Sequence, residues 1–203
     1  MREDGLKRHY SFLEKIKLFY FLIRTKCICK KIRLIRFPII IRGRKYIDFG
    51  RNLTTGYWCR LEVFPNNEDE YKRIILGENI QLNDFVHISA INHVEIGDNC
   101  LFASHIYISD NSHGCYNGCL SDSSPAIPPA KRKYAAYPVK IGNNCWVGEG
   151  VIILPGVTIG EGCIIGAHSV VNKNIPDNCI AVGSPARPIK KYNFKSKCWK
   201  KIV

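Results

Sequence analysis

The chain has 203 residues, enough to bury one sizeable core, and a formal net charge of +13. Residues 1–45 hold 14 Lys and Arg against 3 Asp and Glu, residues 187–203 hold 7 against none, and residues 46–186 hold 9 against 14. Such basic ends suit a membrane surface or a phosphorylated ligand. Nucleic acid is the least favoured partner, because its usual recognition motifs and interleaved aromatic residues are missing.

The first element in chain order is a helix, which we predict over residues 6–35. Apolar residues recur there at three- or four-residue steps, with lysines and arginines among them. The longest apolar run, 18–23, is far shorter than the roughly 20 residues of a membrane span. Two interpretations are open. The helix either caps the fold and buries its apolar stripe there, which we favour, or lies as a basic amphipathic surface on anionic lipid.

Six-residue repeats follow, faint over residues 49–62, clearer from residue 76 and strict over 141–176. In the strict part an aliphatic residue leads each block: Ile141, Val147, Ile153, Ile159, Ile165 and Val171. A period of six is compatible with the alternation of a β-strand but drifts out of phase with an α-helix. Short strands joined by tight turns predict an all-β fold, a parallel β-helix of about five coils.

Residues 114–138 interrupt the repeats with a stretch that is rich in Gly, Ser and Pro. A loop this long inside a compact domain is usually functional, so we expect it to protrude beside a site. The predicted organisation is a basic helical segment at 1–45, a β-helix domain at 46–186 and a basic tail at 187–203.

The ten cysteines do not predict a disulfide framework. Cys100, Cys145 and Cys163 each stand four places after an Ile-Gly leader, where the repeat takes a small apolar side chain. Because the chain opens without the pattern of a signal peptide, we expect free thiols and a cytoplasmic location. The spacings Cys27–Cys29 and Cys115–Cys119 fit no common zinc pattern, so we expect no metal.

His113 ends the third coil and opens the long loop, where an imidazole can accept a proton near neutral pH. Position alone would equally suit a solvated loop histidine. The neighbouring motifs add a resemblance to hexapeptide-repeat acetyltransferases, such as galactoside and maltose acetyltransferases. It rests on residues and motifs in this order: Asn83, Gly97, ISDNSH at 108–113, Trp146, ILPGV at 153–157, KNIP at 173–176 and GSPAR at 183–187.

Within that family, the stretches IRFPIIIRG and IQLNDFVHISAIN are similar to lipopolysaccharide (O-antigen) O-acetyltransferases. The resemblance implies a left-handed β-helix, a homotrimer with active sites between subunits, and acetyl-CoA as donor. His113 would be the general base, Asn83 would orient the acceptor hydroxyl, unless it simply caps a turn, and Trp146 would line the cleft. The resemblance also implies which residues contact CoA: Trp146, Glu149 through a nearby backbone N–H, Ala167, Asn172, Lys173, Arg187 and Lys190.

The sequence therefore predicts an acetyl-CoA-dependent O-acetyltransferase that modifies a sugar hydroxyl of a bacterial surface polysaccharide. One alternative is an acetyltransferase with another small acceptor: an amino sugar, a galactoside- or maltose-type sugar, or a drug. A second is a non-catalytic β-helix scaffold. The basic ends further predict peripheral contact with the anionic inner face of the cytoplasmic membrane, where a lipid-linked acceptor would be met.

Overall fold

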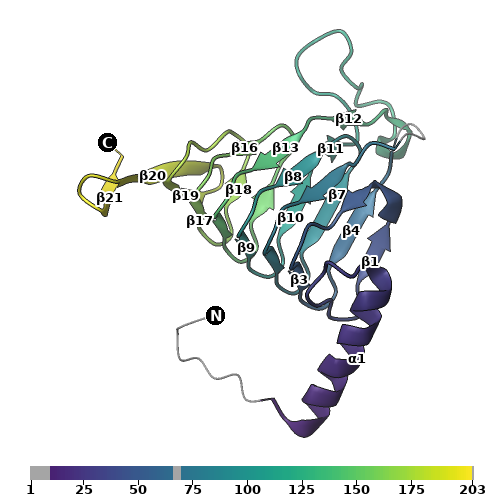
Figure 1. Cartoon of the computed structure of the whole chain (residues 1–203). Helices are drawn as coiled ribbons and strands as arrows, with labels where there is room; N and C mark the ends of the chain where they lie inside the picture. Colours follow the sequence, from purple (N-terminus) through teal and green to yellow (C-terminus); the bar gives the residue numbers. More distant parts are fainter. Residues whose placement is uncertain (1–9, 66–69, 203) are drawn as a thin grey trace.

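Short parallel strands stack along one axis in the computed structural model, which describes residues 10–65 and 70–202 (Figure 1). Sheet A contains β3 (Thr54–Thr55), β6 (Gln81–Leu82), β9 (Leu101–Phe102), β14 (Trp146–Val147), β17 (Ile164–Ile165), β19 (Cys179–Gly183), β20 (Ala186–Asn193) and β21 (Cys198–Lys201). Sheet B contains β1 (Ile40–Arg42), β4 (Arg60–Val63), β7 (His87–Ala90), β10 (Tyr107–Ser109), β15 (Ile152–Ile153) and β18 (Val170–Val171). Sheet C contains β2 (Ile47–Asp48), β5 (Ile74–Leu76), β8 (Val94–Ile96), β13 (Val139–Ile141) and β16 (Thr158–Ile159).

The chain visits sheets A, B and C in turn, and up to β19 the strands of one sheet pair in parallel from coil to coil. Ile108 of β10, for example, pairs with Ile88 before it and Ile153 after it. The predicted parallel β-helix is therefore confirmed. Two short 3₁₀ helices lie outside the sheets, η1 (Arg44–Tyr46) and η2 (Pro129–Lys131).

The six-residue period follows from what fits inside the coils. The six leaders of the strict repeats are buried, as are the residues four places after them: Cys145, Val151, Val157, Cys163, Ser169 and Ile175. Glycine follows a leader because the next coil passes close by. A Cβ on Gly142 would lie 2.6 Å from the backbone nitrogen of Glu161. No side-chain movement would relieve that contact, because the obstructing atom belongs to the backbone.

All ten cysteines are free thiols, as the sequence predicted. Cys100, Cys145 and Cys163 are buried side by side, and Cys145 Sγ lies 3.1 Å from the Gly160 carbonyl oxygen that accepts its hydrogen bond. The hydrogen bond between Cys100 and Cys145, helped by burial, raises the pKa of Cys145 to about 12. These thiols therefore serve as small interior side chains.

The N-terminal helix is shorter than predicted, because α1 runs over Phe12–Ile28. It begins at Ser11, whose hydroxyl accepts from the Glu14 N–H, while the Glu14 carboxylate accepts from the Ser11 N–H. Cys29 turns the chain into an extended conformation. Ile32 and Ile35, which fall within the predicted helix, are fully buried inside the first coil instead. Residues 6–9 of the predicted helix lie outside the described residues.

The preferred interpretation of this helix, a cap with a buried apolar stripe, is wrong because the stripe faces outward. Phe12, Ile16, Phe19 and Ile23 are 76%, 51%, 65% and 52% exposed, and only Phe21 and Thr25 of the helix are buried. Phe21 packs on the first coils and leaves the stripe outside. None of the helices in the described part of the chain is long and apolar enough to cross a membrane.

The helix α1 and the C-terminal hairpin, both basic, lie at opposite ends of the stack (Figure 1). At the N-terminal end, β1 already pairs with β4, so sheet B begins before residue 46. At the C-terminal end, most of residues 187–203 form the antiparallel hairpin of β20 and β21, which extends sheet A. Tyr192 packs there against Trp199 and Phe194.

Asp110, which the repeat pattern did not single out, anchors the end of β10. Its fully buried carboxylate accepts hydrogen bonds from the backbone N–H groups of Ile91, Asn92 and His93, at 2.6 to 3.2 Å. Three otherwise unpaired donors of the preceding coil are satisfied by this one side chain. The chain leads from Asp110 directly into His113, so the same carboxylate fixes the base of the long loop.

We expect Asp110→Ala to lower the free energy of unfolding by about 2–4 kcal/mol, because it leaves one buried and two partly buried N–H groups without this acceptor. Urea unfolding followed by circular dichroism measures the loss. Asp122→Ala is the matched control, since that carboxylate also accepts backbone N–H groups but is exposed to solvent. Equal unfolding midpoints for wild type and Asp110→Ala would contradict the anchoring role.

Candidate functional site

His113 lies at the mouth of a cleft of about 660 Å³ between the outer face of sheet B and the long loop. The imidazole is exposed, as a base that must reach a substrate requires. The cleft is lined by the apolar Val63 and Ile91, the hydroxyl-bearing Ser89, Tyr107 and Tyr134, and the amide of Asn111. This mixture suits a ligand with both apolar surfaces and hydroxyl groups.

The base of the loop is a small antiparallel ladder that brings Tyr134 beside His113. In it, β11 (Asn111–Ser112) pairs with β12 (Ala135–Ala136). Tyr134 is the residue before β12 and His113 the residue after β11, so they face each other one step beyond the ladder. Their ring centroids are 4.5 Å apart, and Tyr134 Oη lies 3.5 Å from His113 Nε2. The loop protrudes from the stack as predicted (Figure 1).

A second contact fixes the backbone of His113. The Tyr116 hydroxyl donates a 2.6 Å hydrogen bond to the His113 carbonyl oxygen, and Arg132 donates to the same hydroxyl at 2.7 Å. Gly114, the next residue, has φ +125°, and a Cβ there would lie 2.4 Å from Tyr116 Oη. The glycine after the histidine is therefore required by both the backbone conformation and the tyrosine.

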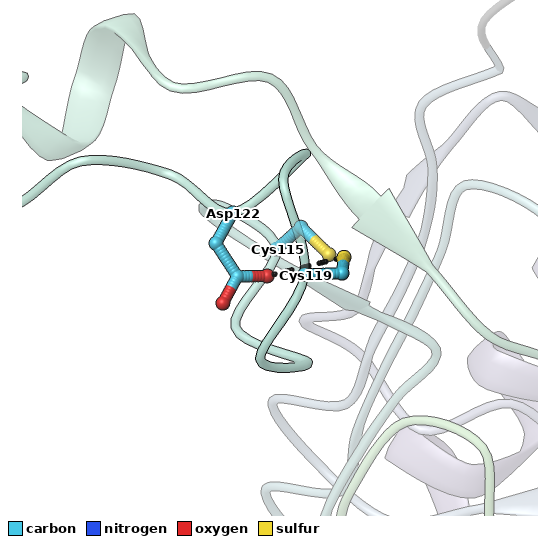
Figure 2. Close-up of side chains that lie close together, drawn as sticks. All are labelled: Cys115, Cys119 and Asp122. Atoms are coloured by element: carbon cyan, nitrogen blue, oxygen red, sulfur yellow. Dashed lines mark hydrogen bonds between the residues drawn. The ribbon is translucent and has the colours of Figure 1, made fainter.

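Cys115, Cys119 and Asp122 converge at the tip of this turn, as Figure 2 shows. Among the residues that the structure describes, they form the group whose ligand atoms lie within 4.8 Å of one another. Hydrogen bonds account for the arrangement: Asp122 accepts from the Asn117 and Gly118 N–H groups at 2.8 Å and from the Cys119 thiol. Three donor residues are one short of a closed structural zinc site.

Asn83 lines a different cleft, of about 490 Å³, between α1 and the edge where sheet A turns into sheet B. Glu14 and Lys17 of α1 and Tyr57 line the same cleft. The turn beside Asn83 is capped by its neighbour Asp84, whose carboxylate accepts from the Tyr57 N–H at 2.7 Å. The side chain of Asn83 is thus exposed to the cleft and is not needed for that turn.

Trp146 belongs to an outward-facing row of sheet A. Its register partner one coil later is Ile164, which pairs in turn with Ile180, and Ile180 pairs with Lys190. The indole is 52% exposed. The row therefore offers an apolar strip of about three side chains that ends in a cation.

Glu149 and Ala167 lie at the A–B edge, one coil apart. The Glu149 carboxylate accepts from the Ser104 N–H of the preceding coil at 2.9 Å. The side chain of Glu149 therefore has a structural partner. Ala167 is exposed and so small that it leaves the edge open beside Gly148.

The side chains of Asn172, Lys173 and Arg187 meet near the other edge of sheet B, where it turns into sheet C, although Arg187 itself belongs to β20 of sheet A. Asn172 and Lys173 directly follow β18, and all three side chains are exposed. The guanidinium of Arg187 reaches across to Asn172, with Nη1 3.4 Å from Oδ1. His113 follows β10 and β11 at this same B–C edge, two strands earlier in the sheet.

The candidate residues therefore form two groups on one chain. Asn83, Trp146, Glu149, Ala167 and Lys190 lie on sheet A or at the A–B edge, whereas His113, Asn172 and Lys173 lie at the B–C edge. Arg187 belongs to β20 of sheet A, but its guanidinium reaches Asn172 and so joins the second group. The strands of sheet B separate the two groups. One chain by itself brings His113 together with Tyr134 but not with Asn83 or Trp146.

Sequence reasoning missed a charged cluster on the outer face of sheet B. Glu62 is only 1% exposed, and its carboxylate lies 3.3 Å from Arg42 Nε, 2.5 Å from Arg60 Nη2 and 3.0 Å from His87 Nε2. Burial, reinforced by the positive charge of Arg60, lowers the pKa of His87, although Glu62 opposes the shift. Glu62 occupies the outward position of a strand, where a sequence pattern predicts solvent.

Comparison with known proteins places these features in context. The family model described as bacterial transferase hexapeptide (six repeats) matches residues 138–173. The chain is 40% identical to an Escherichia coli K12 protein named "Putative lipopolysaccharide biosynthesis O-acetyl transferase WbbJ", over 196 residues and 97% of each chain. It is 36% identical to the galactoside O-acetyltransferase of the same organism over 124 residues, 61% of this chain and 57% of the relative.

A crystal structure of an AntD variant, an N-acyltransferase from Bacillus cereus, in complex with dTDP-4-amino-4,6-dideoxyglucose and coenzyme A, superposes with a TM-score of 0.65. The superposition covers 92% of each chain at 24% identity. At this identity the likeness concerns the fold.

The lowered pKa of His87 makes stability depend on pH. Because the folded protein holds this imidazole neutral below its usual pKa, its contribution is fully present above about pH 6.5 and is lost as pH falls through the lower pKa of the folded state. We expect the melting temperature of wild type to fall between pH 7.5 and pH 5, and that of His87→Gln to fall less. If the melting temperatures of the two proteins fall equally between pH 7.5 and pH 5, His87 is not the source of the pH dependence.

Proposed function

Because the chain belongs to the hexapeptide-repeat acetyltransferase family, we propose that it transfers the acetyl group of acetyl-CoA to a sugar hydroxyl of a bacterial surface polysaccharide. The relative that spans almost the whole chain is named for lipopolysaccharide biosynthesis, which supports this class of acceptor. The observation that carries the chemistry is His113, exposed in a cleft with hydroxyl-bearing walls and held by Tyr134.

In this proposal His113 is the general base. Its free imidazole nitrogen takes the proton of the acceptor hydroxyl as the oxygen attacks the carbonyl carbon of the acetyl thioester. The same nitrogen then returns the proton to the departing thiolate, so the imidazole ends neutral and no acetyl group becomes attached to the protein. Packing against Tyr134 restricts the imidazole ring, which lowers the cost of orienting it for both steps.

The thioester oxygen becomes negatively charged during the reaction, and a backbone N–H near Glu149 would stabilise it. The Glu149 carboxylate would support that backbone indirectly, since it already holds the Ser104 N–H. The apolar row from Trp146 to Ile180 would contact the pantetheine arm, and exposed Ala167 would let the arm pass. Cations at the last coils, namely Lys173, Arg187 and Lys190, would meet the phosphates of CoA, with Asn172 beside Arg187.

A three-fold assembly would unite the two groups of residues. If the B–C edge of one subunit faces the A–B edge of its neighbour, His113 of the first meets Asn83 and Trp146 of the second. The outer faces of the sheets support this arrangement of subunits. Sheets A and B expose the large apolar side chains Trp146, Tyr107 and Ile152, which a subunit contact would cover, whereas sheet C carries the ion pair of Lys140 with Glu95. The proposal includes the left-handed sense of the coils, about five in number, that the family resemblance implies.

We expect His113→Ala to lower acetyl transfer to purified polysaccharide by roughly 10²–10⁴-fold, because the reaction loses its base. Mass spectrometry of the acceptor measures the acetylation. Protection by CoA in a thermal melt should stay as in wild type. His168→Asn is the control, since this histidine is also exposed but lies at a turn of the last coils. Transfer by His113→Ala at the wild-type rate would refute the role, and a wild type without CoA protection would favour the scaffold alternative.

Mixed trimers test whether the sites lie between subunits. His113→Ala and Asn83→Ala chains, denatured and refolded together, would form about a quarter of their sites from the intact His113 of one chain and the intact Asn83 of another. We expect the mixture to be more active than either variant refolded alone. If the mixture shows no more than the average of the two variants, the two residues act on the same chain.

A further inference from the structure

The outer face of α1 is an apolar stripe that no described residue covers. Its members recur at steps of one, three or four residues, so they share one side of the helix: Phe12, Leu13, Ile16, Phe19, Tyr20 and Ile23. All six are more than half exposed. An apolar face this continuous on a surface helix normally has a partner.

The opposite side of α1 fastens the helix to the β-helix and so fixes the direction of the stripe. Phe21 packs against Phe37 and Tyr57, with ring centroids 5.5 and 6.0 Å apart. The buried Thr25 hydroxyl donates to the Phe21 carbonyl oxygen at 2.6 Å and accepts from the Ile35 N–H at 2.9 Å. The stripe therefore cannot turn inward without breaking these contacts.

Cations border the stripe on both sides. By helical geometry Arg24 lies along one border and Lys15 along the other, against the single acid Glu14. The ammonium groups of Lys17 and Lys26 are held on the protein instead, 4.9 Å from the Tyr57 ring centroid and 2.6 Å from the Ile32 carbonyl oxygen. Arg24 stacks on Phe37, with its guanidinium carbon 4.0 Å from the ring centroid, so its charge is held beside the stripe. An apolar strip with a cation on each border matches the layered chemistry of an anionic bilayer surface, with acyl chains beneath and phosphates above.

We propose that α1 docks in the plane of an anionic lipid bilayer, with the stripe among the acyl chains and the flanking cations at the lipid phosphates. A second copy of the chain is the less suitable occupant, because two such helices would bring their basic borders together. The contact belongs to the N-terminal end alone. The C-terminal hairpin lies at the far end of the stack (Figure 1). Its lysines therefore cannot reach the bilayer that α1 contacts when the axis of the stack stands perpendicular to that bilayer.

The proposal goes beyond the acetyl transfer and does not depend on it. The full-length protein is mixed with vesicles of phosphatidylcholine containing about one quarter phosphatidylglycerol, or with pure phosphatidylcholine vesicles, and the bound fraction is measured by flotation. Wild type should float with the anionic vesicles and less so as salt is raised. Phe19→Gln with Ile23→Gln should weaken partitioning by about tenfold or more, since two apolar anchors are lost.

Phe194→Gln is the matched control, because Phe194 is 68% exposed on the other basic end whereas Phe19 is 65% exposed on α1. It should float as wild type does. Lys15→Gln with Arg24→Gln should reduce flotation mainly at low salt. Light scattering of each variant reports the oligomeric state.

Three results would overturn the proposal: a wild type that stays unbound at low salt, equal losses for Phe194→Gln and the α1 double variant, or a change of oligomeric state in the α1 variant without a change in flotation. The last would assign the stripe to a subunit contact. Acetyl transfer to a soluble acceptor, measured in parallel, separates failure of this proposal from failure of the enzymatic one.

Discussion

The backbone ladder between successive coils is the constraint on which the rest of the molecule depends. Each strand donates to the coil that follows, as when the N–H groups of Trp146 and Gly148 donate to the carbonyl oxygens of Cys163 and Ile165 at 2.9 and 2.8 Å. Coils held at this spacing leave room inside for only two side chains per six residues. Where the next coil passes closest, as at Gly142, glycine is needed because a Cβ would meet the neighbouring backbone. Every other side chain must point outward, so the side chains available for binding and catalysis lie on the three outer faces of the sheets and at the edges between them.

Those outward positions have different chemistry on each sheet. Sheet C pairs charges across coils, sheet A lines up Trp146 with two isoleucines, and sheet B buries Glu62 under arginine side chains. Burying a carboxylate costs desolvation free energy unless hydrogen-bonding partners surround it. Arg42, Arg60 and His87 surround Glu62 in this way. The cluster is a rigid patch of sheet B beside the His113 cleft, and it supports the strands on which that cleft is built.

The sequence predicted what depends on periodicity and could not predict what depends on neighbours along the axis. The period of six, with glycine after the leaders, was sufficient for the β-helix, and the break in it located the loop that carries His113. The same reasoning extended the helix too far, over Ile32 and Ile35, which lie inside the first coil. It also placed the stripe of α1 in the core, since a pattern shows which face is apolar but not which face is covered.

The site residues illustrate the same limit. Tyr134 stands 21 residues after His113 in an unpatterned loop, and only the short ladder of β11 and β12 brings them together. Asp110 looks like any turn residue in the sequence, yet it binds three N–H groups of the previous coil. Contacts of this kind join segments whose spacing is set by a loop or by a whole coil, so no local pattern encodes them.

The two proposals meet in α1, whose faces serve different partners. Its stripe points to the proposed membrane, whereas Glu14 and Lys17 line the cleft that contains Asn83. In the two proposals taken together, a single helix of 17 residues separates the Asn83 cleft, as acceptor site, from the lipid surface by no more than its own diameter, roughly 10 Å. An acceptor sugar attached to a lipid could enter the Asn83 cleft while its lipid stays in the bilayer. Under the docking proposal, the position of α1 would bring the Asn83 cleft to the bilayer surface, which a charged tail alone would not do.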